Sequence, residues 1–438
     1  MKTSCVKSLV LTVISILTLS ANLYAEEWQE DWGDDGWEEE ASSPWQIGGF
    51  VEGGYGGRLQ HDTSKNMTAT LGEVRGRIEV DYTADQWQVN LKGDALYDDV
   101  LNKGEWQTRE LALVFSPMDR LDIKAGRQVL TWGTGDYVFL NDLFAKDWQS
   151  FFSGRDDEYL KAPSDSVKAS WFADSFSVDL VWTPEFTPDN TLNGERFSFF
   201  SPTAGSNVAP DPAMTSDKPS GDTGSARLAT HYQGVEYALY GYKGYWTMPL
   251  GIDNQGRLTY PEMNSWGASL RSPLGKGLFN TELAWYDSRE DRAGDNPNIP
   301  NSQFRWLSGY EQEIAANLTA AFQYYLEWTQ DYDQLKTSSP YPQYEVEEYR
   351  HLLTARLTWM TMQQKLTWSL FTFWSPSDKD MYLKPSVTYR MDDNWTIATG
   401  GNLFYGNEQH TFFGQYEDNS NIWMRVLYHP SRHDIFGK

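Results

Sequence analysis

The sequence predicts an all-β fold: a transmembrane antiparallel up-and-down β-barrel of about 18 strands, with 16 as the other count that the pattern allows. Three observations predict it. Short runs alternate polar and apolar residues with a period of two. The connections between these runs alternate between long and short. Trp, Tyr and Phe make up 15% of the chain and gather at the ends of the runs. A closed outer-membrane barrel combines tight turns on one side with long loops on the other.

The first 25 residues predict a secretory signal peptide. Lys2 and Lys7 supply a positive start, Val10 to Leu19 form a short apolar core, and Ala25 is a plausible cleavage point. The only cysteine, Cys5, falls in this segment, so we expect a mature chain without thiol, disulfide or Cys-ligated metal. No later stretch approaches 18 consecutive apolar residues, which excludes helical membrane spans.

Residues 26–44 predict an acidic, Trp-rich periplasmic tail. Within it, residues 26–40 carry nine acids and no base, and they show no hydrophobic period. Such a composition favours a disordered, solvated segment. A second interpretation is a docking strip for a basic periplasmic partner or for cations.

The barrel itself is expected over residues 45–429, followed by a C-terminal extension at 430–438. The clearest strand is 73–82, where five charged positions from Glu73 to Asp81 alternate with Val74, Gly76, Ile78, Val80 and Tyr82. Charges on every second position suit a water-filled lumen, and the apolar face suits lipid. Eighteen such runs begin near residues 45, 72, 87, 106, 121, 166, 176, 225, 235, 265, 278, 303, 318, 349, 364, 382, 395 and 420.

Gaps after even-numbered runs are short and turn-like, as at 83–86, 116–120, 233–234 and 391–394. Gaps after odd-numbered runs are generally longer, with 375–381 as a short exception; they include 133–165, 184–224, 246–264, 288–302, 329–347 and 406–419. An even strand count leaves both termini on the short-turn side, which is the periplasm. Pro385 lies within a run and cannot donate a hydrogen bond, so we expect a bulge or a lost hydrogen bond there.

Aromatic residues decide between a membrane barrel and a soluble β-sandwich with an aromatic core. Amphipathic rings prefer the boundary between lipid and water, and barrels place them there in two girdles. The residues that predict these girdles are Trp87, Trp106, Phe115, Trp171, Trp182, Tyr232, Trp285, Trp328, Trp359, Trp374, Tyr389, Trp395 and Tyr428.

Bases and acids are nearly balanced on the predicted lumen face, so the formal charge of −25 resides mainly in the tail and loops. The net charge therefore does not by itself predict cation selectivity. An acidic outer surface would attract cations, including divalent ions that bridge to lipopolysaccharide. The residues we expect to line the lumen are Arg75, Arg77, Glu79, Lys92, Asp94, Arg127, Arg271, Arg305, Arg356 and Arg425.

A barrel of 18 strands is too wide for side chains of the wall to fill, so a loop must narrow it. The short segment before the first strand excludes a folded N-terminal plug. The third long loop, 133–165, is the candidate constriction, because its apolar residues would be costly in open water and could pack on the wall. A loop that caps the outer mouth is the alternative. The charged residues expected to form the constriction are Asp136, Asp142, Lys146, Arg155, Asp156, Asp157 and Glu158.

Several motifs resemble those of the porin-like outer-membrane barrels of Gram-negative bacteria, which are broadly similar to the alginate-export type. They are the stretches at 126–136, 141–144, 154–163, 375–380, 402–404 and 412–415. The resemblance implies an 18-stranded passive channel for a small or polymeric polar solute, with its third outer loop folded inward. The near balance of charge on the lumen face departs from the strongly basic lumens of alginate exporters.

Other functions have less support. An outer-membrane hydrolase needs a nucleophile or activated water beside a histidine and an orienting acid. None of His61, His231, His351, His410, His429 and His433 has a recognisable serine motif or metal-ligand spacing, so we expect no enzyme activity, metal or cofactor. The absence of a basic patch with interleaved aromatics argues against nucleic-acid binding. The main alternative is an outer-membrane scaffold or exit component that partners a periplasmic complex or exporter, with outer-membrane lipid as the common surrounding.

Overall fold

The computed structural model describes residues 43–430. This range contains the whole of the expected barrel, residues 45–429. The expected signal peptide at 1–25 and nearly all of the expected tail and C-terminal extension lie outside the described residues.

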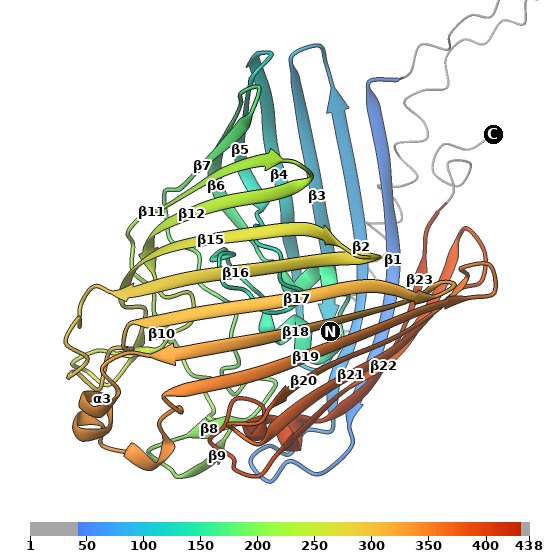
Figure 1. The fold of residues 1–438 in the computed structure, drawn as a ribbon. Coiled ribbons are helices and arrows are strands. Elements are labelled where there is room, and N and C mark those ends of the chain that lie inside the picture. The colour runs from blue at the N-terminus through green and yellow to red at the C-terminus, as the bar shows by residue number, and fades with distance from the viewer. Residues whose placement is uncertain (1–42, 431–438) are drawn as a thin grey trace, which may run out of the picture.

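Eighteen strands form one closed antiparallel barrel, as predicted (Figure 1). Each strand pairs with its neighbours along the chain, and β23 pairs with β1 to close the ring. The strands are β1 (Trp45–Arg58), β2 (Ala69–Thr83), β3 (Trp87–Asp98), β4 (Lys103–Met118), β5 (Leu121–Val129), β6 (Pro163–Phe172), β7 (Phe176–Thr183), β11 (Thr223–Tyr232), β12 (Val235–Tyr245), β15 (Glu262–Leu274), β16 (Gly277–Ser288), β17 (Gln303–Ala315), β18 (Leu318–Thr329), β19 (Tyr349–Thr361), β20 (Leu366–Ser375), β21 (Asp380–Arg390), β22 (Trp395–Gly406) and β23 (Asn421–Tyr428).

The predicted count of 18 is confirmed, and each strand begins within about three residues of its predicted start. The predicted alternation of long and short connections is confirmed too. Besides the short gap between β20 and β21, the gap at 99–102 between β3 and β4 is also short. A period of two identifies strands well here because lipid on one side and a polar interior on the other demand opposite side chains at successive positions.

The two faces of the wall carry different chemistry. On the outer face, Val74 and Leu111 are exposed, whereas Arg75, Arg77 and Asp94 point inward and are buried under other polar groups. Apolar side chains exposed all round a closed sheet are what a lipid environment requires.

Aromatic residues form the outer bands predicted from the sequence: eleven of the thirteen named rings are exposed. Trp87, Trp171, Tyr232 and Trp395 stand at strand ends next to short turns. Trp106, Trp182, Trp328 and Trp374 stand at or near the opposite ends of their strands, on the side of the barrel that carries the long connections. Two bands at opposite ends of the strands correspond to the two interfaces of a bilayer.

Pro385 interrupts the ladder between β21 and β22, as expected. Pairing runs to Leu383 with Leu403 and resumes at Ser386 with Gly400. On its other side Pro385 still lies opposite Leu370 of β20. The missing amide hydrogen therefore costs pairing with one neighbour only.

The remaining elements lie in the connections. Inside the barrel, between β5 and β6, are α2 (Trp148–Ser153) and η2 (Asp157–Leu160) (Figure 1). The other connections carry β8 (Phe199–Ser201), β9 (Ser206–Val208), β10 (Ser216–Asp217), β13 (Gly251–Ile252), β14 (Leu258–Thr259), α3 (Tyr332–Ser338), η3 (Pro342–Tyr344) and η4 (Gly414–Asn419). None of the helices within residues 43–430 is long and apolar enough to cross a membrane.

Candidate functional site

The connection between β5 and β6, residues 130–162, lies inside the barrel and is called the inner loop below. Its backbone is hydrogen-bonded to strands far apart in the ring. Tyr286 of β16 donates to the Leu140 carbonyl at 2.6 Å, and Asn402 of β22 donates to the Phe152 carbonyl at 3.0 Å. The loop therefore extends across the lumen and does not sit as a cap above it.

Aromatic packing holds the middle of the inner loop against β20, β21 and β22. Phe152 lies 5.6 Å from Tyr382 and 5.2 Å from Phe404 between ring centroids. Tyr137 meets Phe371 edge-on at 4.7 Å. These rings belong to one buried cluster inside the barrel. The apolar residues of the loop are thereby removed from water, which is the packing that their sequence predicted.

The position of the short helix α2 is fixed by interactions at its two ends. At its start, the Asp147 side chain accepts a hydrogen bond from the Ser150 amide at 2.8 Å. At its end, Gly154 has a φ of 94°, and a Cβ there would overlap the ring of Trp423 on β23. Only glycine satisfies both the left-handed backbone and the close approach. This turn directs residues 155–158 to partners on β2, β3, β21 and β23.

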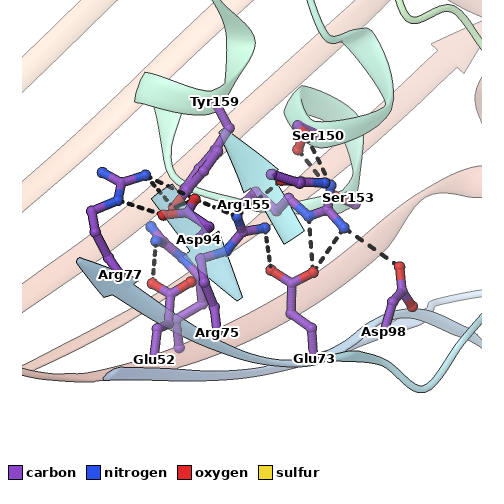
Figure 2. A network of polar contacts seen from close by, with 12 residues as sticks. Glu52, Glu73, Arg75, Arg77, Asp94, Asp98, Ser150, Ser153, Arg155 and Tyr159 are labelled. Carbon is purple, nitrogen blue, oxygen red and sulfur yellow. Dashed lines mark hydrogen bonds and ion pairs between the residues drawn. The ribbon is translucent and has the colours of Figure 1, made fainter. Parts of the chain in front are cut away.

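Arg155 joins the end of α2 to the wall (Figure 2). Its guanidinium donates to Glu73 at 2.9 Å and to the Ser150 hydroxyl at 3.0 Å, and it lies 3.4 Å from Asp98. Burial opposes the charged form, but the carboxylates of Glu73 and Asp147 together outweigh it, so the pKa of Arg155 is raised. Such a paired, hydrogen-bonded charge is the form in which a buried arginine is tolerated.

A second cluster adjoins the first. Asp94 of β3 accepts from Arg75 at 2.7 Å and from Arg77 at 2.7 and 3.0 Å. The Tyr159 hydroxyl of η2 donates to the same carboxylate at 2.9 Å, and its ring lies 4.1 Å from the Arg75 guanidinium (Figure 2). Arg75 also pairs with Glu73 at 3.3 Å, so it is Arg77 that faces an acid of the inner loop, Glu158.

Four acids of the inner loop each pair with a base on a different strand. The pairs are Asp136 with Arg356 at 3.3 Å, Asp156 with Arg425 at 3.2 Å, Asp157 with Lys384, and Glu158 with Arg77. Exposure is unequal in the last three pairs: 39–48% for the acids but 2–8% for their bases. The side of the loop that meets water therefore presents carboxylates, and the cations behind them are covered.

Burial affects the protonation of Asp136. Desolvation raises its pKa, and Arg356 opposes that effect only in part. Lys161, near the other end of the loop, shows the matching behaviour for a base, because burial lowers its pKa.

The structure places the other predicted constriction residues differently. Asp142 and Lys146 form a buried ion pair at 3.0 Å, so their charges face each other rather than open water. Arg155 is buried as well. Within the predicted set, only Asp136, Asp156, Asp157 and Glu158 meet water at the surface of the loop.

Most of the predicted lumen residues do point inward. Lys92 pairs with Glu79 at 3.2 Å, and Arg305 lies 3.4 Å from Glu327. Arg271 shares their face on β15, in the alternation set by buried Ser265 and Ser269. The remaining members, Arg75, Arg77, Asp94, Arg356 and Arg425, take part in the contacts described above.

The prediction for Arg127 is wrong. It lies opposite Leu111, whose side chain is exposed on the outer face, and its own guanidinium pairs with the exposed Asp165 at 3.2 Å. The neighbouring Gln128 is the residue that points inward and is buried. The alternation along β5, and not the charge of the side chain, decides which face Arg127 takes.

Two arginines of the site were not predicted. Arg109 is the extra residue of a bulge opposite Lys92 and Gly93, and it turns inward to donate to the carbonyls of Glu158 and Lys161. Arg196 comes from the connection at 184–222 and pairs with Asp98. A bulge breaks the period of two, and a loop has no period, so neither residue carries a signal in the sequence.

The 184–222 connection crosses the mouth of the barrel. Arg196 donates to the Thr70 carbonyl at 2.6 Å, and Asn419 donates to the Ser198 carbonyl at 2.9 Å. Beside it, a cavity of about 900 Å³ leads to the inner loop. Aromatic residues such as Trp148, Phe373 and Phe412 line it together with the charges of Arg305, Glu327 and Arg350. Within residues 43–430, no group of three or more His, Asp or Glu side chains is arranged to hold a metal ion.

Comparison with known proteins bears on the fold. No protein-family model matches the chain, and no curated protein matches it in sequence. Solved structures do match. OccK11 (OpdR) of Pseudomonas aeruginosa has a TM-score of 0.52 at 10% identity, covering 88% of this chain and 95% of its own. OccAB3 of Acinetobacter baumannii has a TM-score of 0.53 at 9% identity, covering 88% of this chain and 98% of its own. OccK2 (OpdF) of P. aeruginosa has a TM-score of 0.53 at 12% identity, covering 88% of this chain and 97% of its own. This chain thus shares the barrel fold of outer-membrane porin-like proteins from Gram-negative bacteria.

Proposed function

We propose that this protein is a passive channel for polar solutes in the bacterial outer membrane, with the inner loop as its constriction. The observation that carries the proposal is the division of the closed wall into an apolar, aromatic-banded outside and a charged inside. A water-soluble protein gains nothing from exposing apolar side chains all round, whereas a lipid-embedded barrel requires it. The termini would then lie on the periplasmic side, next to the short turns.

The inner loop supports the second half of the proposal. It crosses the lumen, and its water-facing acids are backed by covered bases. Fixed carboxylates at a narrow point raise the local concentration of cations and lower that of anions. Neutralising these acids should therefore shift the ion preference toward anions, whatever the preference of the native channel.

The cavity of about 900 Å³ beside the 184–222 connection favours a polar solute that also has apolar faces. Its aromatic rings can stack on such faces, and its arginines and acids can bind hydroxyl or carboxylate groups. One of the similar barrels, OccK2, has been solved in complex with glucuronate. Glucuronate and glucose form a suitable first pair of probes, because they differ only at C6, which is a carboxylate in glucuronate and a hydroxymethyl group in glucose.

Conductance across planar bilayers tests the channel directly. The native protein should give discrete, ohmic steps, and deletion of 136–158 should enlarge them, because that segment occupies the lumen. Deletion of 253–257, at the tip of a different connection, is the control and should leave the steps unchanged. Heat-modifiable migration on gels shows that each variant has folded. Absence of steps from folded native protein and from the folded deletion would contradict the proposal.

The alternative function, an outer-membrane scaffold or exit component, is suggested by residues 26–40. Their acidic composition suits a basic periplasmic partner. Co-purification from cells with and without these residues tests it, and a partner lost only with the tail would support the alternative.

A further inference from the structure

The outer wall carries a groove over β6, β7, β11, β12 and β15 that the channel function does not use. Its volume is about 700 Å³. Pairing register places its residues in two rows across the strands. The first row is Val167, Trp182, Gly224, Lys243 and Asn264, and the second row is Ala169, Leu180, Ala226, Gly241 and Trp266.

The floor of the groove is made of small residues on β11 and β12. Gly224, Ala226 and Gly241 lie between Leu180 and Trp182 on one side and Trp266 on the other. Leu180, Trp182 and Trp266 are each more than half exposed and form the raised edges. Below the floor, Leu228 and Leu239 lie opposite each other in the next outward row and close it.

Neither glycine is required by the backbone or by crowding. Neither has a φ in the left-handed region, and a Cβ at either position would meet no described atom within 4 Å. Glycine inside a strand weakens the strand, and it often marks a place where another molecule approaches closely. Because Gly224 and Gly241 have no side chains, the wall is hollowed at these positions.

A single base stands at the end of the hollow. Lys243 is exposed on the outer face, in the same row as Trp182 of the aromatic band. Lys243 takes part in none of the ion pairs formed among the described residues. A lysine near the end of a membrane strand reaches toward the interface, where it can meet a negatively charged headgroup.

We propose that this groove is a binding site for an anionic membrane lipid, with an acyl chain over Gly224, Ala226 and Gly241 and the phosphate at Lys243. The proposal rests on the membrane location in the proposed function. Lipid is favoured over a second copy of the chain because the hollow is short, apolar and ends in one uncompensated positive charge. Acyl chains already surround such a wall, and a phosphate supplies the missing negative charge.

The test uses the full-length protein in mixed micelles of phosphatidylglycerol and phosphatidylcholine with identical acyl chains. Native mass spectrometry then counts the lipids that stay bound. We expect the native protein to retain phosphatidylglycerol with about a fivefold preference, the ratio given by one lysine–phosphate contact. Lys243→Gln should abolish the preference while some lipid of either kind remains. Gly241→Leu should fill the hollow and release both lipids.

Two control variants match these changes. Gly53→Leu places the same side chain at another open glycine on the outer face, on β1, and Lys276→Gln removes a base from a short turn. Both should retain lipid as the native protein does. Equal retention by Gly241→Leu and Gly53→Leu would overturn the proposal. So would an oligomer of the native protein that Gly241→Leu alone dissociates, because a second copy would then occupy the groove.

Conductance of the same variants separates the two proposals. Lost lipid preference with unchanged conductance steps supports the lipid site. Absence of lipid preference in a conducting native protein overturns the lipid site alone, whereas folded protein without conductance overturns the channel.

Discussion

At the scale of single residues, the site depends on charges that are buried together. Arg155, Glu73 and Asp98 have little contact with water, and their burial is tolerated because they pair with one another and with Arg75 and Arg196. The same contacts join Arg155 of the 33-residue inner loop to β2 and β3 of the wall. Removing a partner therefore tests both the energetics and the position of the loop.

Arg155→Met should destabilise the folded protein by about 3–5 kcal/mol, because it leaves Glu73 and Asp98 buried with less compensating charge. Hydrogen exchange should rise across residues 148–160, and the midpoint of denaturant unfolding should fall. Lys161→Met, on the same loop but partly exposed, is the control and should change both readouts little. Equal effects of the two substitutions would show that the buried cluster does not hold the loop.

Because of Asp136, we expect the stability of the protein and the charge of the inner loop to depend on pH. Burial raises its pKa above the value in the unfolded chain. The folded protein therefore takes up this proton first as the pH falls. The associated stabilisation is fully present below the unfolded pKa and is lost as the pH rises through the folded pKa. Protonation also removes the pair with Arg356 and one negative charge from the loop surface.

Lowering the pH from neutral through the raised pKa of Asp136 should thus shift the reversal potential in a salt gradient toward anions. In Asp136→Asn the shift should already be present at neutral pH, and the pH-dependent part should be smaller. Identical pH profiles of the native protein and the variant would exclude Asp136 as the titrating group.

At the scale of elements, Gly154 shows how one residue sets the course of the inner loop. Gly154→Ala forces a side chain into a left-handed backbone, at a cost of about 1–2 kcal/mol, and toward the ring of Trp423. Gly234→Ala is a matched control, because Gly234 also has a positive φ but has open space around it. Gly154→Ala alone should increase hydrogen exchange in α2 and widen the distribution of single-channel conductance. A narrow, unchanged distribution would contradict the constriction role.

The strands could be predicted from the sequence, and most loop contacts could not. Strand β2 is plain in the sequence because every second residue meets a different solvent. Arg109 is hidden from this pattern by a bulge, and Arg196 by a connection without periodicity. Composition marked the inner loop correctly as a segment needing burial. It could not show that Asp142 and Lys146 satisfy each other, because that depends on a fold of the loop that no period encodes.

At the scale of the whole molecule, closure leaves the barrel sheet without a free edge, which is necessary where lipid offers no hydrogen bonds. The seam between β1 and β23 uses eight residue pairs. It is reinforced inside by Arg425, which donates to Glu52 at 2.9 Å while also pairing with Asp156 of the inner loop. The seam and the loop therefore share one arginine, and the barrel and the inner loop are coupled at this point.

The orientation of the barrel gives the last prediction. The only cysteine lies at position 5, within the predicted signal peptide. A mature chain cleaved near Ala25 therefore has no thiol of its own. Thr337→Cys places a thiol in the long 330–348 connection, and Asp85→Cys places one in the short 84–86 turn; both positions are exposed. A membrane-impermeant maleimide applied to intact cells should label Thr337→Cys. It should label Asp85→Cys only after the outer membrane is permeabilised, because short turns are expected on the periplasmic side. Native protein supplies the unlabelled control, and labelling of Asp85→Cys in intact cells without Thr337→Cys would reverse the proposed orientation.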